Sequence, residues 1–361
     1  MSTFESLIIY MDTFLLSLCF YWKAMRSHNG NVVFRLLALL VPSVMAMFRT
    51  SGADYKTYIQ YYETIQEIGF GINREPLWVL LNIISPSKYV MLFGASMLFL
   101  LFSDFAIQEQ LKENQDIAWM IVLLVFYSTF MNIMRQMIAV AIVVWAYGGL
   151  KNCKKSFGYI RYYIGVFVSF LFHSYAILMT MLPLVIWMAK KVKEYDKFIL
   201  LSAIILPAYM PLFVQIATAL GIFKKYLSGV VLDIDPYFIA CMLPTFFIYY
   251  FVGGRETHSE ETNNLFNIYM ISFVVQAIGF RAMYVDRLTY FFYFFMVLLV
   301  PKILQEVQPI LMKRLRPQML NDGKTLQIQA LFTHLFILWF VVYYFAVFFV
   351  VGTATVFPYI K

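Results

Sequence analysis

Five arginines fall at the ends of apolar segments. These ends are expected on the outer side of the membrane, where membrane proteins carry few cations. They are Arg49, Arg74, Arg135, Arg281 and Arg287. Polar residues accompany them at the same ends, namely Asp54, Glu75, Gln136, Asp286 and Tyr290. A guanidinium group binds phosphate oxygens through two parallel hydrogen bonds. Several guanidinium groups in one aqueous cavity would therefore hold a diphosphate. The alternative for any one of them is a side chain that reaches for lipid headgroups.

Two residues on that side have the chemistry of a general base. Glu75 follows Arg74 and precedes a short apolar helix, and His173 interrupts the apolar stretch SFLFHSYAIL, where the chain is expected to reverse. A carboxylate or an imidazole within hydrogen-bond reach can take a proton from a sugar hydroxyl. The alternatives are a Glu75 that only caps its helix and a His173 that only bonds Ser174 at the turn.

Three of the arginines have surroundings that suggest a partner. Arg135 lies in the first turns of the apolar helix in FMNIMRQMIAVAIV, where a charge is costly unless it faces water or a partner. Arg281, Asp286 and Arg287 share a connection of about six residues between apolar runs. An ion pair ordering a tight turn there is the alternative to ligand binding, and the two do not exclude each other.

Tyrosines cluster in the stretch RTSGADYKTYIQYYETI. Tyr55, Tyr58, Tyr61 and Tyr62 follow one another at near-helical spacing on what is predicted to be a polar loop. Exposed aromatic faces stack on sugar rings, whereas tyrosine belts at membrane interfaces are also common. The pattern is compatible with sugar contact and with a belt.

The composition is that of a polytopic membrane protein. Hydrophobic residues make up 62% of the 361 residues, charged residues 13%, and the mean hydropathy is +0.73. Each helical crossing needs roughly 20 apolar residues, so the apolar runs predict an all-α fold with about 12 transmembrane helices. They are expected near residues 4–22, 32–48, 88–107, 116–131, 134–150, 160–173, 174–190, 197–213, 235–252, 263–281, 287–305 and 327–349. The apolar run 75–85 is too short to span and predicts an interfacial or re-entrant helix.

The distribution of charge predicts an orientation. Most of the 28 Lys and Arg residues fall on one set of connections when the N-terminus is placed outside, as the positive-inside rule requires. The same rule accounts for the net charge of +8, so this charge does not indicate nucleic-acid binding. We expect a single transmembrane domain over residues 1–361, with outer loops near 49–87, 214–234 and 281–287 contributing to the site.

Several classes of chemistry have no motif in this sequence. It contains no Walker-type glycine-rich loop, no HExxH and no cluster of His and Cys at metal-ligand spacing. The three cysteines are scattered, which predicts neither a disulfide framework nor a metal site. We therefore expect no metal and no cofactor. His28 and His258 fall in inner loops and are assigned no role.

The segments RTSGADYKTY, GFGINREPLW, MRQMIAVAI, FHSYAIL and DRLTYFFYF together resemble the EpsG-like branch of the Wzy-type polysaccharide polymerases. The resemblance spans roughly residues 45 to 295. It implies a GT-C-like helical fold in the bacterial inner membrane, with an active site facing the periplasm or outside. It also implies a metal-independent glycosyltransferase that moves a growing glycan from undecaprenyl diphosphate to the non-reducing end of a second lipid-linked repeat unit. The implied partners are these two lipid-linked substrates, membrane lipid, a chain-length regulator and a flippase, without nucleic acid.

The resemblance and the residue chemistry together suggest a role for each candidate. Arg135, Arg281 and Arg287 would bind the diphosphate, while Arg49, Asp54 and Tyr55 would bind the acceptor or order the loop. Either Glu75 or His173 would be the base, with Arg74 tuning the pKa of Glu75. Gln136, Asp286 and Tyr290 complete the expected substrate-binding set.

Two rival functions fit part of the same pattern. A flippase for lipid-linked sugars would also have many helices and a cationic cavity, but its charges should lie deep in the membrane, within two related halves. A membrane acyltransferase would need a histidine accessible to a cytoplasmic acyl donor, for which His28 is the one candidate.

Overall fold

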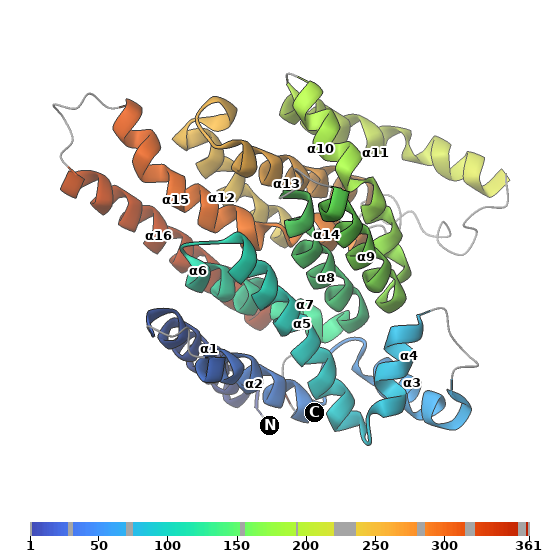
Figure 1. Ribbon diagram of the computed structural model, residues 1–361. Coiled ribbons are helices and arrows are strands. Elements are labelled where there is room, and N and C mark those ends of the chain that lie inside the picture. The colour runs from blue at the N-terminus through green and yellow to red at the C-terminus, as the bar shows by residue number, and fades with distance from the viewer. Residues whose placement is uncertain are drawn as a thin grey trace. The chain divides into compact units, whose positions relative to one another are not determined.

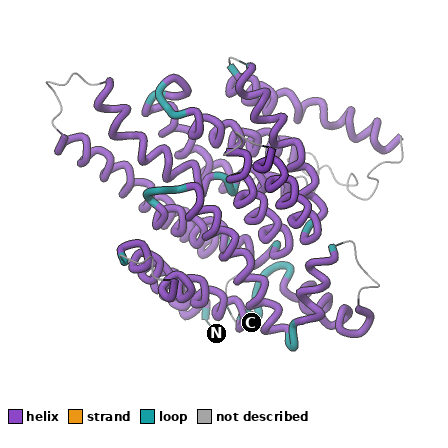
Figure 2. The backbone as a smooth tube through the Cα atoms, viewed as in Figure 1, coloured by secondary structure: helices purple, strands orange, loops and turns teal. Residues whose placement is uncertain are grey.

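The computed structural model describes residues 2–27, 32–69, 75–151, 156–192, 194–219, 236–279, 286–314, 322–352 and 359. Throughout this described part every regular element is a helix and no strand occurs, as Figure 2 shows. The chain divides into two compact units. The first unit comprises Met1–Ile177 with Val307–Lys361, and the second comprises Leu178–Glu306. The expected single transmembrane domain stays a prediction.

The helices of the first unit follow one another along the chain and are joined by short connections (Figure 1). They are α1 (Thr3–Arg26), α2 (Val32–Phe48), α3 (Tyr55–Ile68), α4 (Pro76–Ile84), α5 (Lys88–Gln110), α6 (Gln115–Ile121), the π-helical η2 (Val122–Phe126), α7 (Tyr127–Asn132), α8 (Met134–Lys151), α9 (Ser156–Phe172), α16 (Asp322–Tyr344) and the π-helical η6 (Phe345–Val350). The second unit holds α10 (Leu182–Lys191), α11 (Tyr195–Ala219), α12 (Pro236–Val252), η4 (Gly254–Glu256), α13 (Glu260–Gly279), η5 (Asp286–Thr289) and α14 (Tyr290–Tyr293). The 3₁₀ helix η3 (Ser174–Met181) and α15 (Met296–Arg314) run across the boundaries between the units.

Each predicted helical range falls on helical structure over its described residues, with three corrections. The range 287–305 is not one α-helix, because it divides into η5, α14 and α15. The range 174–190 is not one α-helix, because a 3₁₀ segment leads into α10 and Pro183 occupies the first turn, where proline starts a helix well. The predicted outer loop near 49–87 contains two helices, α3 and α4, so the tyrosine stretch is not a loop. The short helix expected at 75–85 is α4, which has nine residues.

Five helical segments of the described residues are long and apolar enough to cross a membrane. They are Thr3–Arg26, Lys88–Gln110, Gln115–Asn132, Arg287–Val307 and Gln327–Val350, and a bent pair of helices, Ser174–Lys191 and Tyr195–Leu206, would make a sixth. Several apolar helices therefore identify a membrane protein. The figure of about 12 spans stays a prediction, since helices such as α2 and α9 have only 17 residues each.

Helix α8 is the core of the first unit, where it packs against α5 and α9 (Figure 1). Apolar residues cover it on all sides, as expected for a helix enclosed by others, and nearly all of it is buried. Small residues let α9 approach closely: a Cβ added at Gly165 would lie 2.3 Å from the Ala146 Cβ, and one at Gly149 would lie 2.6 Å from the Gly158 carbonyl oxygen. This small-residue contact is typical of helices packed within membranes.

Helix α2 contains a proline whose missing hydrogen bond is replaced from α1. Pro42 has no N–H, so the Ala38 carbonyl loses its partner within the helix. The Ser17 hydroxyl donates to that carbonyl at 2.6 Å, and the Trp119 indole N–H in turn donates to the Ser17 oxygen at 3.0 Å. These bonds fix α1, α2 and α6 together without an unpaired buried carbonyl.

The charged side chains of the first unit gather at the two ends of α8. At the end near Lys151, Arg161 forms two hydrogen bonds of 2.5 Å to Glu109, and Arg35 pairs with Asp104 at 3.2 Å. At the other end lie Arg49 and Arg135. An 18-residue helix is about 27 Å long, so the two sets are well separated.

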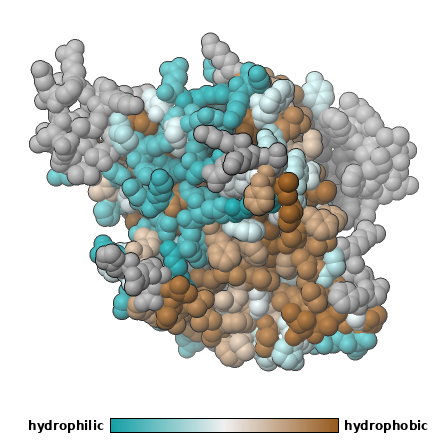
Figure 3. Space-filling model, in the orientation of Figure 1, coloured by the Kyte–Doolittle hydropathy of each residue, from teal (hydrophilic) through white to brown (hydrophobic). Residues whose placement is uncertain are grey.

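An apolar surface lies between these ends. Figure 3 shows hydrophobic residues, in brown, over α1, α2 and α5 in the lower part of the view. Exposed apolar side chains on α1 and α2 include Leu15, Leu36 and Phe48. Such a surface suits contact with lipid.

Candidate functional site

Glu75 lies at the start of α4, within the first unit. Pro76 begins the helix, and Glu75 occupies the position before it, but the Glu75 side chain makes no capping hydrogen bond. The capping alternative is therefore wrong. The side chain instead turns toward α8 and α9, and the residue is only 6% exposed. A carboxylate this buried requires partners.

Arg135 supplies the first partner. The chain breaks its helical course at Ile133, between α7 and α8, which puts Arg135 in the first turn of α8. One of its terminal nitrogens forms an ion pair with Glu75 Oε2. About a third of the Arg135 side chain remains exposed. Glu75 compensates the charge of Arg135 and is therefore the partner that the apolar surroundings of this arginine require.

His173 supplies the second partner. It lies directly after α9, and its Nδ1 is 2.9 Å from Glu75 Oε1, while the Ser174 backbone N–H donates to the same oxygen at 3.3 Å. The alternative in which His173 bonds only Ser174 is wrong, since both residues bond Glu75. Burial raises the pKa of Glu75, but the hydrogen bond from His173 and the charge of Arg135, with the Ser174 N–H, outweigh it and leave that pKa below its usual value.

These contacts determine which nitrogen of His173 is free. A Glu75 with a lowered pKa is a carboxylate and only accepts hydrogen bonds. His173 Nδ1 must therefore carry the proton that it donates. In a neutral ring Nε2 then carries the lone pair, and this buried nitrogen has no hydrogen-bond partner among the described residues. The arrangement of carboxylate, imidazole and open nitrogen is that of an oriented general base.

Two tyrosines of α3 enclose the guanidinium of Arg135. The Tyr61 ring centroid lies 5.7 Å from it, and the buried Tyr58 hydrogen-bonds it. The Tyr61 hydroxyl is buried and has no partner among the described residues. Two buried polar atoms near the ion pair, this hydroxyl and His173 Nε2, are therefore without partners. Buried polar groups in proteins are usually paired, so two unpaired atoms in one place distinguish this region as a candidate site.

Arg49 is buried completely near the same end of α8. One of its nitrogens donates to the Ser51 carbonyl at 3.0 Å and another lies 3.6 Å from the Met134 sulfur. No carboxylate pairs with it in the described part of the chain. Gly52 has a φ of +122°, and a Cβ there would lie 2.8 Å from Arg49 Nη1, so only glycine fits. These contacts favour the loop-ordering role over acceptor binding.

The neighbours of Arg49 belong to the same turn. The Tyr55 ring lies 5.8 Å from the Arg49 guanidinium, and the Asp54 backbone N–H donates to the Asn132 side chain at 3.0 Å. The turn is thereby attached to the break between α7 and α8 that positions Arg135. Gln136, in the first turn of α8, is 3% exposed.

The remaining candidates lie in the second unit or outside the described residues. Arg287 and Tyr290 lie in η5 and α14 of the second unit, where both are half-buried. Arg74, Arg281 and the side chain of Asp286 lie outside the described residues. The convergence of all five arginines on one cavity stays a prediction.

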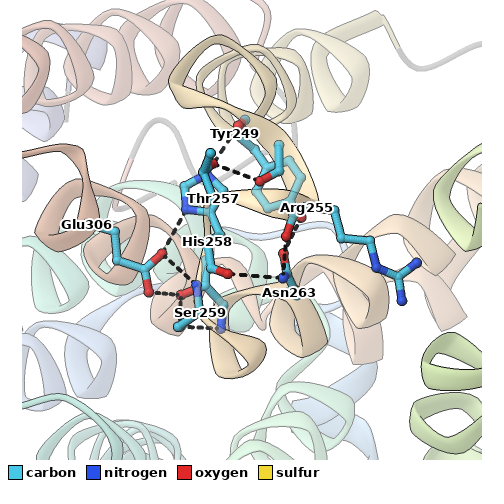
Figure 4. Close-up of polar contacts among 9 residues, drawn as sticks. Tyr249, Arg255, Thr257, His258, Ser259, Asn263 and Glu306 are labelled. Atoms are coloured by element: carbon cyan, nitrogen blue, oxygen red, sulfur yellow. Dashed lines mark hydrogen bonds and ion pairs between the residues drawn. The ribbon is translucent and has the colours of Figure 1, made fainter. Parts of the chain in front are cut away.

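A second polar cluster, in the second unit, also contains a histidine and a glutamate (Figure 4). His258 Nδ1 lies 2.7 Å from Glu306 Oε2, and His258 Nε2 lies 3.1 Å from the Tyr249 carbonyl oxygen. Thr262 and the Ser259 N–H donate to the same carboxylate. Sequence reasoning gave His258 no role, and the spacing of these residues carries no signal that would have joined them.

The fold and the site together define an all-helical integral membrane protein with a buried Glu–Arg–His cluster at one end of its core helix. The family model of the EpsG family matches residues 32–360, so the chain belongs to the EpsG family. Neither a curated protein nor a solved structure matches it. Membership is consistent with a role in polysaccharide polymerisation.

Proposed function

We propose that this protein polymerises oligosaccharide repeat units carried on undecaprenyl diphosphate, at the outer face of the bacterial inner membrane. It transfers the growing glycan to the non-reducing end of a new lipid-linked repeat unit, as in the synthesis of O-antigen or a related surface polysaccharide. The observation that carries the proposal is the open Nε2 of His173, oriented through Nδ1 by Glu75 and adjacent to Arg135.

The chemistry follows from these positions. His173 Nε2 takes the proton from an acceptor hydroxyl while the hydroxyl oxygen attacks the anomeric carbon of the donor sugar. The bond from that carbon to the diphosphate oxygen breaks, and its electron pair leaves with the lipid diphosphate. One such displacement inverts the anomeric centre. Glu75 acts as a positioning residue, because it holds the ring orientation and the tautomer.

Arg135 stabilises the leaving group in this proposal. A guanidinium has five N–H donors, and its contacts with Glu75 and Tyr58 leave others for a phosphate oxygen. Fixed donors aimed at developing charge are usually the largest catalytic contribution. Arg281 and Arg287 remain proposed as further diphosphate ligands, and the Tyr61 hydroxyl as a contact for a sugar.

The proposal is tested by incubating the purified protein with defined undecaprenyl-diphosphate repeat units, without added nucleotide or metal. We expect a ladder of polymer on a gel. His173→Asn keeps an N–H near the position of Nδ1 but has no base, and it should lower the rate about 10²- to 10⁴-fold. His334→Asn is the matched control, because His334 is exposed and bonds only a carbonyl of its own helix, so its ladder should be normal.

The flippase alternative gives a different result in cells. Loss of a polymerase leaves single repeat units on the outer face of the membrane, whereas loss of a flippase leaves them inside. A His173→Asn strain with its repeat units inside, or a purified His173→Asn protein with a normal ladder, would contradict the proposal.

A further inference from the structure

The first unit contains an apolar groove far from the candidate site. Leu15, Leu18 and Trp22 of α1 form one wall, Ile117 and Met120 of α6 form another, and Ile337 of α16 closes it. Its volume is about 280 Å³, slightly below the roughly 300–1,000 Å³ of pockets for drug-sized ligands. Leu15 is 58% exposed and Trp22 45%. An apolar groove of this volume with exposed lining residues fits a hydrocarbon chain.

Two opposite charges flank the Trp22 end of this groove. Asp116, at the start of α6, lines the groove beside Trp22, and its carboxylate accepts only the neighbouring Ile117 N–H, at 3.0 Å. Arg26 lies one helical turn beyond Trp22 on α1, with its guanidinium 3.9 Å from the Trp22 ring centroid. Neither charge belongs to an ion pair within the described residues.

The position of these charges corresponds to a membrane interface. Helix α1 is long and apolar enough to span a bilayer, and Trp22 and Arg26 lie in its last turns. Tryptophan and basic residues are enriched where a span meets the headgroup region. A lipid with its acyl chain in the groove would therefore bring its headgroup to Asp116 and Arg26.

We propose that this groove is a binding site for a phospholipid with a primary-amine headgroup, phosphatidylethanolamine. One acyl chain lies along Leu15, Leu18 and Ile337, the phosphate binds the Arg26 guanidinium, and the ammonium donates to the Asp116 carboxylate. Phosphatidylglycerol has no cation for Asp116. Phosphatidylcholine has a quaternary ammonium without an N–H donor, so it cannot form the charge-assisted hydrogen bond.

The experiment is native mass spectrometry of the full chain, purified and delipidated in detergent. Phosphatidylethanolamine, phosphatidylcholine and phosphatidylglycerol with identical acyl chains are added at equal concentration. We expect phosphatidylethanolamine to be retained about three- to tenfold more than either competitor, the modest range of a partly exposed charge pair. Equal retention of the three lipids by the wild type would overturn the proposal.

Two variants assign the selectivity to the groove. Asp116→Asn should abolish the preference for phosphatidylethanolamine over phosphatidylcholine, and Arg26→Gln should weaken retention of all three lipids. Lys23→Gln is the matched control, since Lys23 lies in the same last turn but stacks on Phe34, 4.3 Å from its centroid, and does not line the groove. A preference that persists in Asp116→Asn, or an equal loss in Lys23→Gln, would refute the site.

A measurement on the unaltered protein covers the case of a variant that fails to fold. Cys19 lines the groove and is an exposed free thiol. In nanodiscs its reaction with a maleimide, followed by mass spectrometry of the Cys19 peptide, should be about threefold slower or more in phosphatidylethanolamine than in phosphatidylcholine. Equal labelling rates in the two lipids would count against the groove as the binding site.

Discussion

The protein contains two histidine–glutamate pairs, which differ in whether the second ring nitrogen of the histidine has a hydrogen-bond partner. His258 has a fully buried side chain, and both of its ring nitrogens have partners, Glu306 and the Tyr249 carbonyl (Figure 4). His173 has a side chain that is 16% exposed, and it bonds Glu75 through Nδ1 alone. The first pair has no ring nitrogen without a partner, whereas the second pair leaves the buried Nε2 of His173 unpaired among the described residues.

The two histidines also differ in whether a ring nitrogen keeps a free lone pair. The Tyr249 carbonyl can only accept, so His258 Nε2 carries a proton. His258 Nδ1 then meets Glu306 through a second ring proton or through a proton on the carboxyl, and in either arrangement no lone pair stays free. His173 in its neutral form keeps the Nε2 lone pair. A histidine beside a glutamate is therefore a base only where its second nitrogen is left open.

The carboxylates differ as well. Thr262 and the Ser259 N–H complete the hydrogen bonds of Glu306, and these groups attach the connection between η4 and α13 to α15. Glu75 is completed by Arg135, whose side chain is about one third exposed. The pair in the second unit thus has its hydrogen bonds completed within the fold, and the pair in the first unit is the one to which the proposal assigns a base and a cation.

The largest expected effect comes from making the same substitution in both pairs. Glu75→Gln removes the charge that orients His173 and leaves Arg135 without its counterion, so the polymerisation rate should fall about 10²- to 10⁴-fold. Glu306→Gln should keep the rate within about twofold and lower the melting temperature instead, because it weakens a partly buried hydrogen-bond cluster around the buried His258. The checks are the length ladder and thermal unfolding in detergent. Equal rates for the two variants would remove the distinction between the pairs.

The helices could be predicted from the sequence, because each apolar run is long compared with its connections. The cluster could not be assembled in the same way. Arg135 and His173 lie 60 and 98 residues from Glu75 along the chain, and what joins them is the packing of α4 and α8 against α9. Glu75, Arg135 and His173 were each identifiable by type and position. Their mutual contacts depend on close approaches at glycines that no single-sequence pattern reveals.

Arg49 shows a different limit. The sequence suggested two roles for it, binding the acceptor or ordering the loop, and did not distinguish them. The turn formed by Ser51 and Gly52 folds over the guanidinium and buries it, which favours the loop-ordering role. Glycine three residues after the arginine was the available signal, because only glycine adopts that backbone conformation without strain.

A smaller effect is expected at the contact between α8, which carries Arg135, and α9, which His173 directly follows. A methyl group at Gly165 would meet the Ala146 Cβ at 2.3 Å, so Gly165→Ala should force α9 away from α8. Overpacking of this kind costs about 1–3 kcal/mol, and a displacement of about 1 Å at His173 would lower the rate by up to about 10²-fold. Thermal unfolding and the length ladder measure the two effects.

The compensating change supplies the control for that contact. Gly165→Ala with Ala146→Gly moves the methyl group from one helix to the other, so the double variant should recover most of the stability and rate. Gly94→Ala in α5 meets only the tip of Leu81, at 3.2 Å, and should change little. If the double variant were no more stable or active than Gly165→Ala alone, the contact between α8 and α9 at these residues would not determine the geometry of the site.

The smallest effect is the dependence of stability on pH. The pKa of Glu75 is lowered from its ordinary value of 4.5 in the folded protein, so its contribution to stability is present above that value and is lost as pH falls through the folded pKa. A protonated Glu75 resembles glutamine, so the melting temperatures of wild type and Glu75→Gln should differ by a constant amount above about pH 5 and converge below pH 4.5. The gap at neutral pH should be about 1–2 °C for each kcal/mol lost, since the entropy of unfolding grows with chain length. Glu194→Gln, which alters an exposed pair with Lys197, should run parallel to the wild type throughout. A gap that persists unchanged to pH 3.5 would mean that Glu75 stabilises the fold without its charge, and that the open pair differs from the closed one in geometry alone.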